Sequence, residues 1–282
     1  MKTLYRLEAL TPIFSYGADP FYRERANGGA IHQGTPEIRS ASIRGQLRWW
    51  MEALGYSNRV GTIFGSIAGN DRGTASKVIV RVSDINGTVG RKRSTQQHHW
   101  STKPCFLPET TFSLHLKERF GGLCSEDREV LSNTVEAWIL LGTLGGRGTR
   151  AGGSLIDSEN LLSEADWSNR IPQLFEESSH LKVRLGKSHF SSESEARLMI
   201  CDTLEENAFP RGEKPLGGIT PRKTSPLRMR VVRFSDPNQL GLYRIAFVWT
   251  EKSIDPLKRA IEELKQEMKR IGTELEEASL IR

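Results

Sequence analysis

The segment EIRSASIRGQLRWWMEALG, residues 37–55, decides how the first part of the chain folds. Apolar residues recur in it at spacings of three and four, which predicts a helix with one buried face. The residues of this stripe are Leu47, Trp50, Met51 and Leu54. Ser42 is the expected N-cap, since a serine hydroxyl accepts a hydrogen bond from the first turn, and Gly55 is the expected end. Because Trp50 belongs to the stripe, Trp49 must face elsewhere, and we favour packing against a second layer over a platform that stacks bases.

Strands are predicted on both sides of this helix. Residues 2–10 alternate between polar and apolar side chains, as a half-buried strand does. The same alternation marks 77–82 and 110–118, and a short strand is expected at 154–156. A second helix is expected to begin at Ser125. The order strand, helix, strand, strand, helix, strand is that of the ferredoxin-like (RRM-like) fold, whose helices pack on one face of an antiparallel sheet.

The second half of the chain repeats this mixture of elements. The expected strands are 180–186, 227–234 and 242–249. A polar helix is predicted at 191–206. From Ser253 onward, apolar residues at spacings of four and three, the last of them Leu275, predict a long helix with a narrow apolar seam.

These elements indicate an α+β protein with tandem ferredoxin-like domains. Residues 1–157 would form an N-terminal domain with long loops, and residues 158–282 a second, degenerate domain that ends in the long helix. Glycine, proline and charged residues predict loops at 15–39, 84–108 and 207–226.

The composition indicates a globular protein that attracts polyanions. Lys and Arg together number 40 against 34 Asp and Glu, a net charge of +6. Three scattered cysteines support neither a disulfide framework nor a structural zinc site, and we expect no metal and no cofactor. Neither a signal peptide nor an apolar run of about 18 residues is present, so a cytoplasmic protein without a membrane segment is expected.

The first basic element is the start of the helix in 37–55. Arg44 and Arg48 lie one turn apart, and Arg39 comes just before the expected cap. Free N–H groups of a first turn, joined by such guanidinium groups, would form a site for a phosphate. The alternative is that these arginines pair with Glu37 and Glu52.

The second basic element is the glycine-rich stretch GTLGGRGTRAGGSL, residues 142–155. Glycine lets a backbone approach a ligand closely, and the two arginines supply charge at the same place. The stretch matches neither the P-loop nor the dinucleotide-binding fingerprint. The alternative is a flexible linker, which the two arginines among the glycines argue against. The RNA-binding residues predicted across both elements, the strand at 77–82 and the loop at 84–108 are Arg39, Ser42, Arg44, Arg48, Lys77, Arg91, Lys92, Arg93, Gly145, Gly146, Arg147 and Arg150.

Taken together and in order, these blocks resemble a known family. EIRSASIRGQLRWW, IFGS at 63–66, ASKV at 75–78 and GGRGTRAGGSL resemble the RAMP superfamily of CRISPR systems. With TPIFSYGAD at 11–19, they resemble more narrowly the first RAMP subunit of type III-B (Cmr) effector complexes. The resemblance covers the first 157 residues and little beyond PRKTSPLRMRV at 221–231.

The resemblance implies a non-catalytic subunit that holds the 3′ part of a guide RNA and helps to capture target RNA in antiviral defence. It also implies other RAMP subunits as partners, with target cleavage carried out by those subunits. Carried onto this chain, the helix from Arg39 to Arg48 and the glycine-rich stretch become RNA-facing elements. The loop before the helix would touch RNA or neighbouring subunits through Tyr16, Arg23, Arg25 and His32.

Two other functions remain open on the sequence. A guide-processing endoribonuclease of the same superfamily would use histidine as general acid and base, and the candidates are His32, His98 and His99. A scaffold subunit would contact proteins through the C-terminal helix and bind little RNA.

Overall fold

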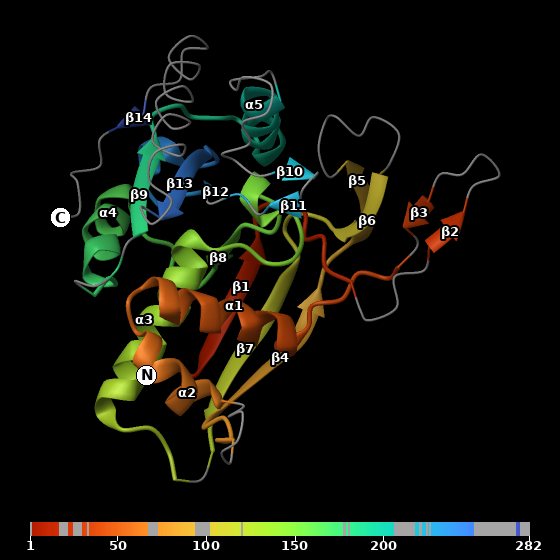
Figure 1. Cartoon of the computed structure of the whole chain (residues 1–282). Helices are drawn as coiled ribbons and strands as arrows, with labels where there is room; N and C mark the ends of the chain where they lie inside the picture. Colours follow the sequence, from red (N-terminus) through yellow and green to blue (C-terminus); the bar gives the residue numbers. More distant parts are fainter. Residues whose placement is uncertain are drawn as a thin grey trace.

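The computed structural model of the chain is shown in Figure 1. It describes residues 2–16, 22–24, 30–32, 34–66, 73–93, 102–119, 121–176, 179, 181–205, 218–219, 222–223, 225, 227–250 and 275–276.

The first sheet has the predicted strand order. Its strands are β1 (Leu4–Ala9), β4 (Val78–Asn86), β7 (Thr111–Glu118) and β8 (Leu155–Asp157), and they lie in the order β4-β7-β1-β8 with antiparallel pairing throughout. The helices between them are α1 (Ser40–Ala53), α2 (Ser57–Phe64) and α3 (Ser125–Leu141). Tyr5, Leu7 and Ala9 point into the core, as the alternation of residues 2–10 predicts.

The second sheet repeats the strand order of the first. Its strands are β9 (Leu181–Gly186), β12 (Arg228–Val232), β13 (Arg244–Thr250) and β14 (Leu275–Glu276), ordered β12-β13-β9-β14 and antiparallel. Helix α5 (Glu193–Glu205) follows β9, and α4 (Glu164–Gln173) lies between the two sheets in sequence. This order is the one that the proposed second ferredoxin-like domain requires. The predicted helix from Ser253 falls outside the described residues, except that Leu275 lies in a strand, so its predicted end was wrong.

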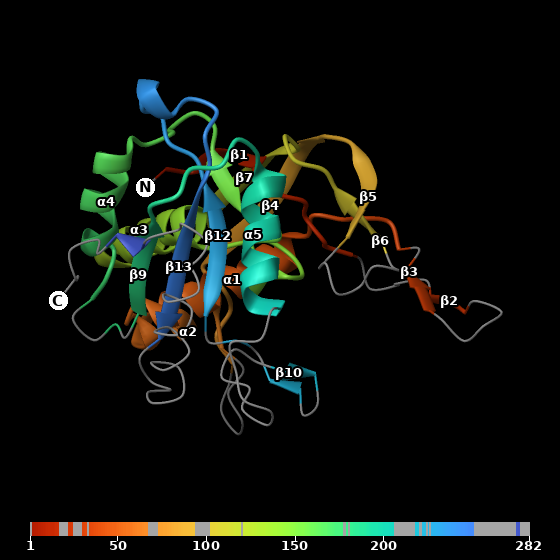
Figure 2. The ribbon, with the colours of Figure 1, turned by 90° about the horizontal axis from the view of Figure 1, so that it is seen from above.

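Helices α1 and α3 separate the two sheets. One buried cluster joins residues of β1, α1 and α3 to Val183, Val232 and Val248 of the second sheet. The opposite face of that sheet, including Val231, packs with Ile200 of α5. Figure 2 shows β9, β13 and β12 side by side, with α5 beyond β12. The layers are therefore sheet, helices, sheet and helix.

Helix α1 differs from the prediction at its N-terminal end. The helix begins at Ser40, and its N-cap is Arg39, whose side chain makes no capping hydrogen bond. Ser42 is thus already inside the first turn, and its prediction as the N-cap was wrong. Gly55 does end the helix: with φ of 103° it adopts the left-handed conformation and donates to the carbonyl of Glu52.

The three predicted loops contain short hairpins. Segment 15–39 holds β2 (Tyr22–Glu24) and β3 (Ala30–His32), 84–108 holds β5 (Val89–Arg93) and β6 (Thr102–Phe106), and 207–226 holds β10 (Gly218–Ile219) and β11 (Arg222–Lys223). The loop predictions were wrong there, and for β5 the reason is that a strand exposed to solvent lacks an apolar alternation. In β5, for example, four of the five residues are exposed.

Candidate nucleic-acid interface

Segment 13–16 attaches the β5–β6 hairpin to the body of the protein. Ile13 and Phe106 exchange backbone hydrogen bonds of 2.9 and 3.1 Å. The hydroxyl of Tyr16 donates to the carbonyl of Pro104 at 2.6 Å. The hairpin thus contacts both ends of segment 13–16. This segment lies within the block TPIFSYGAD, residues 11–19.

The same segment joins the glycine-rich stretch to the start of α1. The N–H of Gly146 donates to the carbonyl of Phe14 at 2.7 Å. One residue further, the N–H of Glu37 donates to the carbonyl of Ser15 at 2.9 Å. The hairpin, the glycine-rich stretch and the approach to Arg39 therefore meet along one four-residue segment, although they are far apart in the sequence.

The glycine-rich stretch is a tightly fixed turn and not a flexible linker. Gly153 has φ of 72°, and a Cβ added there would lie 1.9 Å from the carbonyl oxygen of Leu144. The N–H of Ala151 donates to Met229 of β12 at 3.1 Å, so the stretch also touches the second sheet. Arg147, with φ of 64°, holds a left-handed conformation that costs a non-glycine residue roughly 1–2 kcal/mol. Its side chain is exposed.

Positive charges gather where the hairpin faces this turn. Lys92 and Lys103 are directly opposite each other in the hairpin. Partial burial first, and the nearby charge of Arg147 second, lower the pKa of the Lys103 ammonium. Like charges placed opposite each other destabilise a sheet, so their presence together favours an anionic partner. Arg91 donates to the carbonyl of Thr102 at 2.7 Å, which fixes its guanidinium on the hairpin.

The arginines at the start of α1 do not pair with the acids considered as the alternative. Arg44 donates to the carbonyl of Phe64 at 3.0 Å, and Arg48 donates to that of Gly65 at 2.7 Å. Both guanidinium groups thus sit at the C-terminal end of α2, where the helix dipole favours a cation. Neither forms an ion pair with Glu37 or Glu52 within the described part of the chain. Arg44 stays exposed, whereas Arg48 is half-buried.

The first turn of α1 has open donors. It contains no acidic side chain and no side-chain cap, and Ser42 is half-buried within it. The Nε of Arg39 is buried without a hydrogen-bond partner in the described structure. Lys77, half-buried at the start of β4, is joined to α2 through its N–H and the carbonyl of Ile63 at 3.0 Å. The chain just before Arg39 thus contacts the same segment 13–16 as the glycine-rich turn, whereas Lys77 is joined to α2.

Sequence reasoning missed the partner of Trp49. The guanidinium carbon of Arg228 lies 3.9 Å from the centre of the Trp49 ring, and Trp50 meets that ring edge-on at 5.1 Å. Trp49 thus packs against a second layer, as we favoured. Burial lowers the pKa of Arg228, and its guanidinium forms no ion pair or hydrogen bond among the described residues. The signal that could have found it is the alternation of arginine with apolar residues at 228–232.

Comparison with known proteins identifies the family at this point. A sequence profile of the RAMP superfamily matches residues 6–156, which contain segment 13–16, the hairpin and the glycine-rich turn. The chain belongs to the RAMP superfamily. A curated relative, the CRISPR system Cmr subunit Cmr1-2 of Pyrococcus furiosus, is 32% identical over 115 residues. That match covers 36% of this chain and 50% of the relative, so the chain matches about half the length of that protein.

Solved structures share the fold of this RAMP protein. The crystal structure of apo Cmr1 from Pyrococcus furiosus is similar with a TM-score of 0.55 and 15% identity, over 88% of this chain and 87% of that one. A chain in the cryo-EM structure of the type III-B Cmr-beta complex bound to cognate target RNA has a TM-score of 0.54 and 11% identity, over 94% and 98% of the two chains. The arrangement of helices and antiparallel sheets is therefore that of Cmr1-type RAMP structures.

The described structure does not test the histidine candidates. His98 and His99 lie outside the described residues, and His32 ends β3, where only the backbone is described. No group of three or more histidine, cysteine, aspartate and glutamate side chains that could hold a metal occurs in the described ranges. No described helix is long and apolar enough to cross a membrane.

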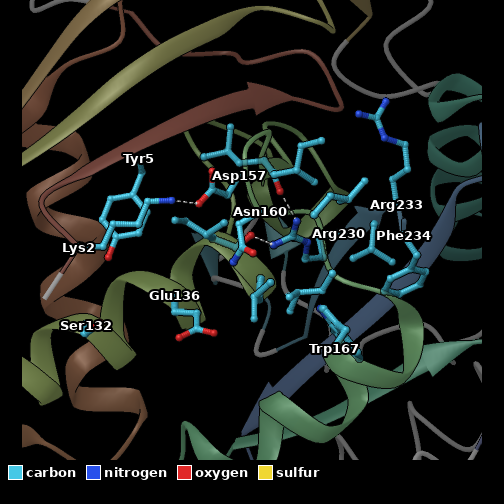
Figure 3. A pocket seen from close by; sticks show the side chains of 17 residues that line it. Lys2, Tyr5, Ser132, Glu136, Asp157, Asn160, Trp167, Arg230, Arg233 and Phe234 are labelled. Carbon is cyan, nitrogen blue, oxygen red and sulfur yellow. Dashed lines mark hydrogen bonds and ion pairs between the residues drawn. The ribbon is translucent and has the colours of Figure 1, made fainter. Parts of the chain in front are cut away.

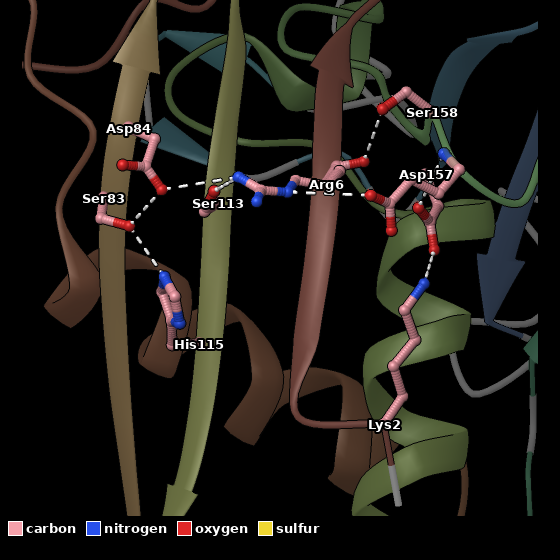
Figure 4. A network of polar contacts seen from close by, with 9 residues as sticks. Lys2, Arg6, Ser83, Asp84, Ser113, His115, Asp157 and Ser158 are labelled. Carbon is pink, nitrogen blue, oxygen red and sulfur yellow. Dashed lines mark hydrogen bonds and ion pairs between the residues drawn. The ribbon is translucent and has the colours of Figure 1, made fainter.

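A serine and a histidine do meet on the open face of the first sheet (Figure 4). The Oγ of Ser83 lies 2.7 Å from Nε2 of His115 and donates to Asp84 at 2.8 Å. The hydroxyl also bonds to Asp84, and no hydrogen bond among the described residues joins the His115 ring to a carboxylate. In a hydrolase the acid would orient the histidine instead. The contact is a polar network of the sheet surface, which Arg6 extends to Ser113.

Proposed function

We propose that this RAMP protein is a non-catalytic RNA-binding subunit of a type III-B CRISPR effector ribonucleoprotein. In this role it holds the 3′ part of the guide RNA and helps to capture target RNA in antiviral defence, in the cytoplasm and beside other RAMP subunits. The observation that carries the proposal is the convergence of the β5–β6 hairpin, the glycine-rich turn and the start of α1 along segment 13–16. We call these four parts the basic junction.

The basic junction is suited to a phosphodiester backbone. Lys92, Arg93 and Arg147 are exposed on it and contribute positive charge. Contacts to phosphates position a nucleic acid without reading its bases. Binding should therefore tolerate changes of RNA sequence and fall steeply with salt, as counterion release requires.

The basic junction is a different surface from the open sheet face that RRM domains use. RRM domains stack bases on aromatic residues of the sheet. On this sheet the outward residues include Arg6, Arg81 and His115, and the described part of that face carries no phenylalanine, tyrosine or tryptophan side chain. The sheet face therefore supplies the natural control surface for an RNA-binding experiment.

The experiment measures binding and cleavage of a labelled guide-like RNA by the purified chain across a salt series. The test variant carries Lys92→Gln, Arg93→Gln and Arg147→Asn, since asparagine tolerates the left-handed backbone at that position. The control variant carries the same loss of charge on the sheet side, with Arg81→Gln, Lys117→Gln and Arg119→Gln. All six side chains are exposed, so neither variant should disturb the core.

We expect salt-sensitive binding without cleavage. In a plot of log affinity against log salt concentration, the slope of the test variant should be less steep by roughly 2, because each lost phosphate contact contributes roughly 0.7 to the slope. The control variant should bind like the natural chain. Equal loss in both variants would refute the assignment to the basic junction. Cleavage abolished by His32→Ala, His98→Ala or His99→Ala would instead identify a processing endoribonuclease.

A further inference from the structure

A partly open pocket lies where the two sheets approach each other, away from the basic junction (Figure 3). Its volume is about 160 Å³. The first-sheet side supplies β1, α3 and β8, and the second half supplies the start of α4 and the region of β12. Tyr5, Trp167 and Phe234 form aromatic parts of its wall. A cavity of about 150 Å³ lined by apolar residues is large enough to hold benzene.

Arg230 brings a buried positive charge to this cavity. Its side chain is 2% exposed, and the guanidinium donates to the carbonyls of Ile139, Leu155 and Val231. A guanidinium has five N–H donors, so two remain without a hydrogen bond in the described structure. No described carboxylate pairs with Arg230. Burial lowers its pKa to about 9, which leaves it charged at neutral pH.

The other charged groups of the wall are already paired. Lys2 meets Asp157 at 2.6 Å, and Arg233 meets Glu8 at 3.2 Å. Glu136 is held by Arg170 of α4 at 2.7 Å. Among the described residues that line the cavity, the charge of Arg230 is therefore the one without a counterion. A buried charge left in this way is costly, so a bound anion would relieve the cost.

We propose that this cavity is a binding site for a small aromatic monoanion, with a carboxylate on the Arg230 guanidinium and the ring among Tyr5, Trp167 and Phe234. The volume limits the ligand to about one ring with a small substituent. The site is separate from the proposed RNA-binding function, and either can be wrong without the other. Because both halves of the protein supply its wall, an occupant holds the second sheet on the first and stabilises the fold.

Benzoate is the probe, and benzamide is its neutral isostere. We expect benzoate to raise the melting temperature of the full chain and to bind in calorimetry roughly 10- to 100-fold more tightly than benzamide, because a hydrogen bond to a charged group is the stronger one. Equal binding of the two compounds would overturn the carboxylate assignment. No binding of benzoate at tens of millimolar would overturn the site.

Three variants separate the cavity from general effects of charge. Arg230→Met removes the proposed anchor, and benzoate binding should be lost. Leu140→Trp keeps Arg230 but fills the space from α3, which tests the site even if the first variant does not fold; binding should again be lost. Arg233→Met removes one charge from the same wall, where the guanidinium is already paired, and binding should persist. Unchanged benzoate binding by Leu140→Trp would refute the proposal.

Discussion

Lys92 and Lys103 are directly opposite each other in the β5–β6 hairpin, and Arg147 approaches the same place from the glycine-rich turn. Like charges in this position weaken a hairpin. A bound anion that lies across the two lysines would offset their repulsion. A change of charge at one lysine should therefore alter both the stability of the fold and the affinity for RNA.

Replacement of one of these lysines should separate stability from RNA binding. Lys103→Glu places opposite charges across the hairpin, so we expect a gain of about 0.2–1 kcal/mol in the free energy of unfolding. RNA affinity should fall at the same time, because a positive charge becomes negative. Urea unfolding and fluorescence anisotropy would measure the two effects. A variant that both unfolds more easily and binds RNA normally would contradict the account.

The pKa of Lys103 should depend on the charge of Arg147. Its pKa is lowered in the folded protein by burial first and by Arg147 second. A lysine with a lowered pKa opposes folding while it is protonated, and this penalty disappears as the pH rises through the lowered pKa toward the ordinary one. Arg147→Asn should therefore raise the pKa of Lys103, and bound RNA should raise it further. NMR titration of the Lys103 side chain would measure both shifts, and no change in the Asn variant would contradict the proximity.

The Trp49–Arg228 contact should contribute to the packing of the second sheet on α1. Arg228→Met keeps most of the apolar length of the side chain but removes the cation, so we expect a loss of about 1 kcal/mol in unfolding free energy. Trp49→Ala removes the ring itself and should cost about 2 kcal/mol or more. If Arg228→Met were as stable as the natural chain in urea, the stacking would not stabilise the fold.

The glycine-rich turn should tolerate no side chain at Gly153. Gly153→Ala places a methyl group against the carbonyl of Leu144, and we expect a loss of about 2–4 kcal/mol. Gly121→Ala is the matched control, because Gly121 also has a positive φ, of 89°, but open space around it. That variant should lose about 1 kcal/mol. Equal losses in thermal unfolding would mean that conformation alone, without the close approach, fixes the turn.

The sequence predicted the elements whose side chains enter the core. The stripe of α1 and the alternation of β1 appear as expected, because burial imposes the period of each element on the apolar residues. The hairpin β5–β6 could not be predicted in this way, since Val89–Arg93 stand in solvent and their backbone pairing leaves no apolar pattern.

The sequence indicated which basic residues belong to the candidate site, but it predicted only some of the contacts that they make. The sequence singled out the arginines of the glycine-rich turn, and their contact with RNA stays a prediction. The alternative that Arg44 and Arg48 pair with Glu37 and Glu52 was wrong, because both guanidinium groups donate to carbonyls at the end of α2. These contacts join residues that are 20 and 17 positions apart in the sequence, which is beyond the reach of a local rule. The pairing of Trp49 with Arg228 joins α1 to β12 of the second sheet, and the arginines alternating with apolar residues at 228–232 marked only one of the two partners.

The most direct test of the central claim is a map of RNA contacts by photo-crosslinking of a thiouridine-containing guide-like RNA to the purified chain, followed by mass spectrometry. The account predicts crosslinks to segment 13–16, to the β5–β6 hairpin and to the turn that carries Arg147. Crosslinks gathered instead on the open sheet face, around Arg81 and His115, would contradict it.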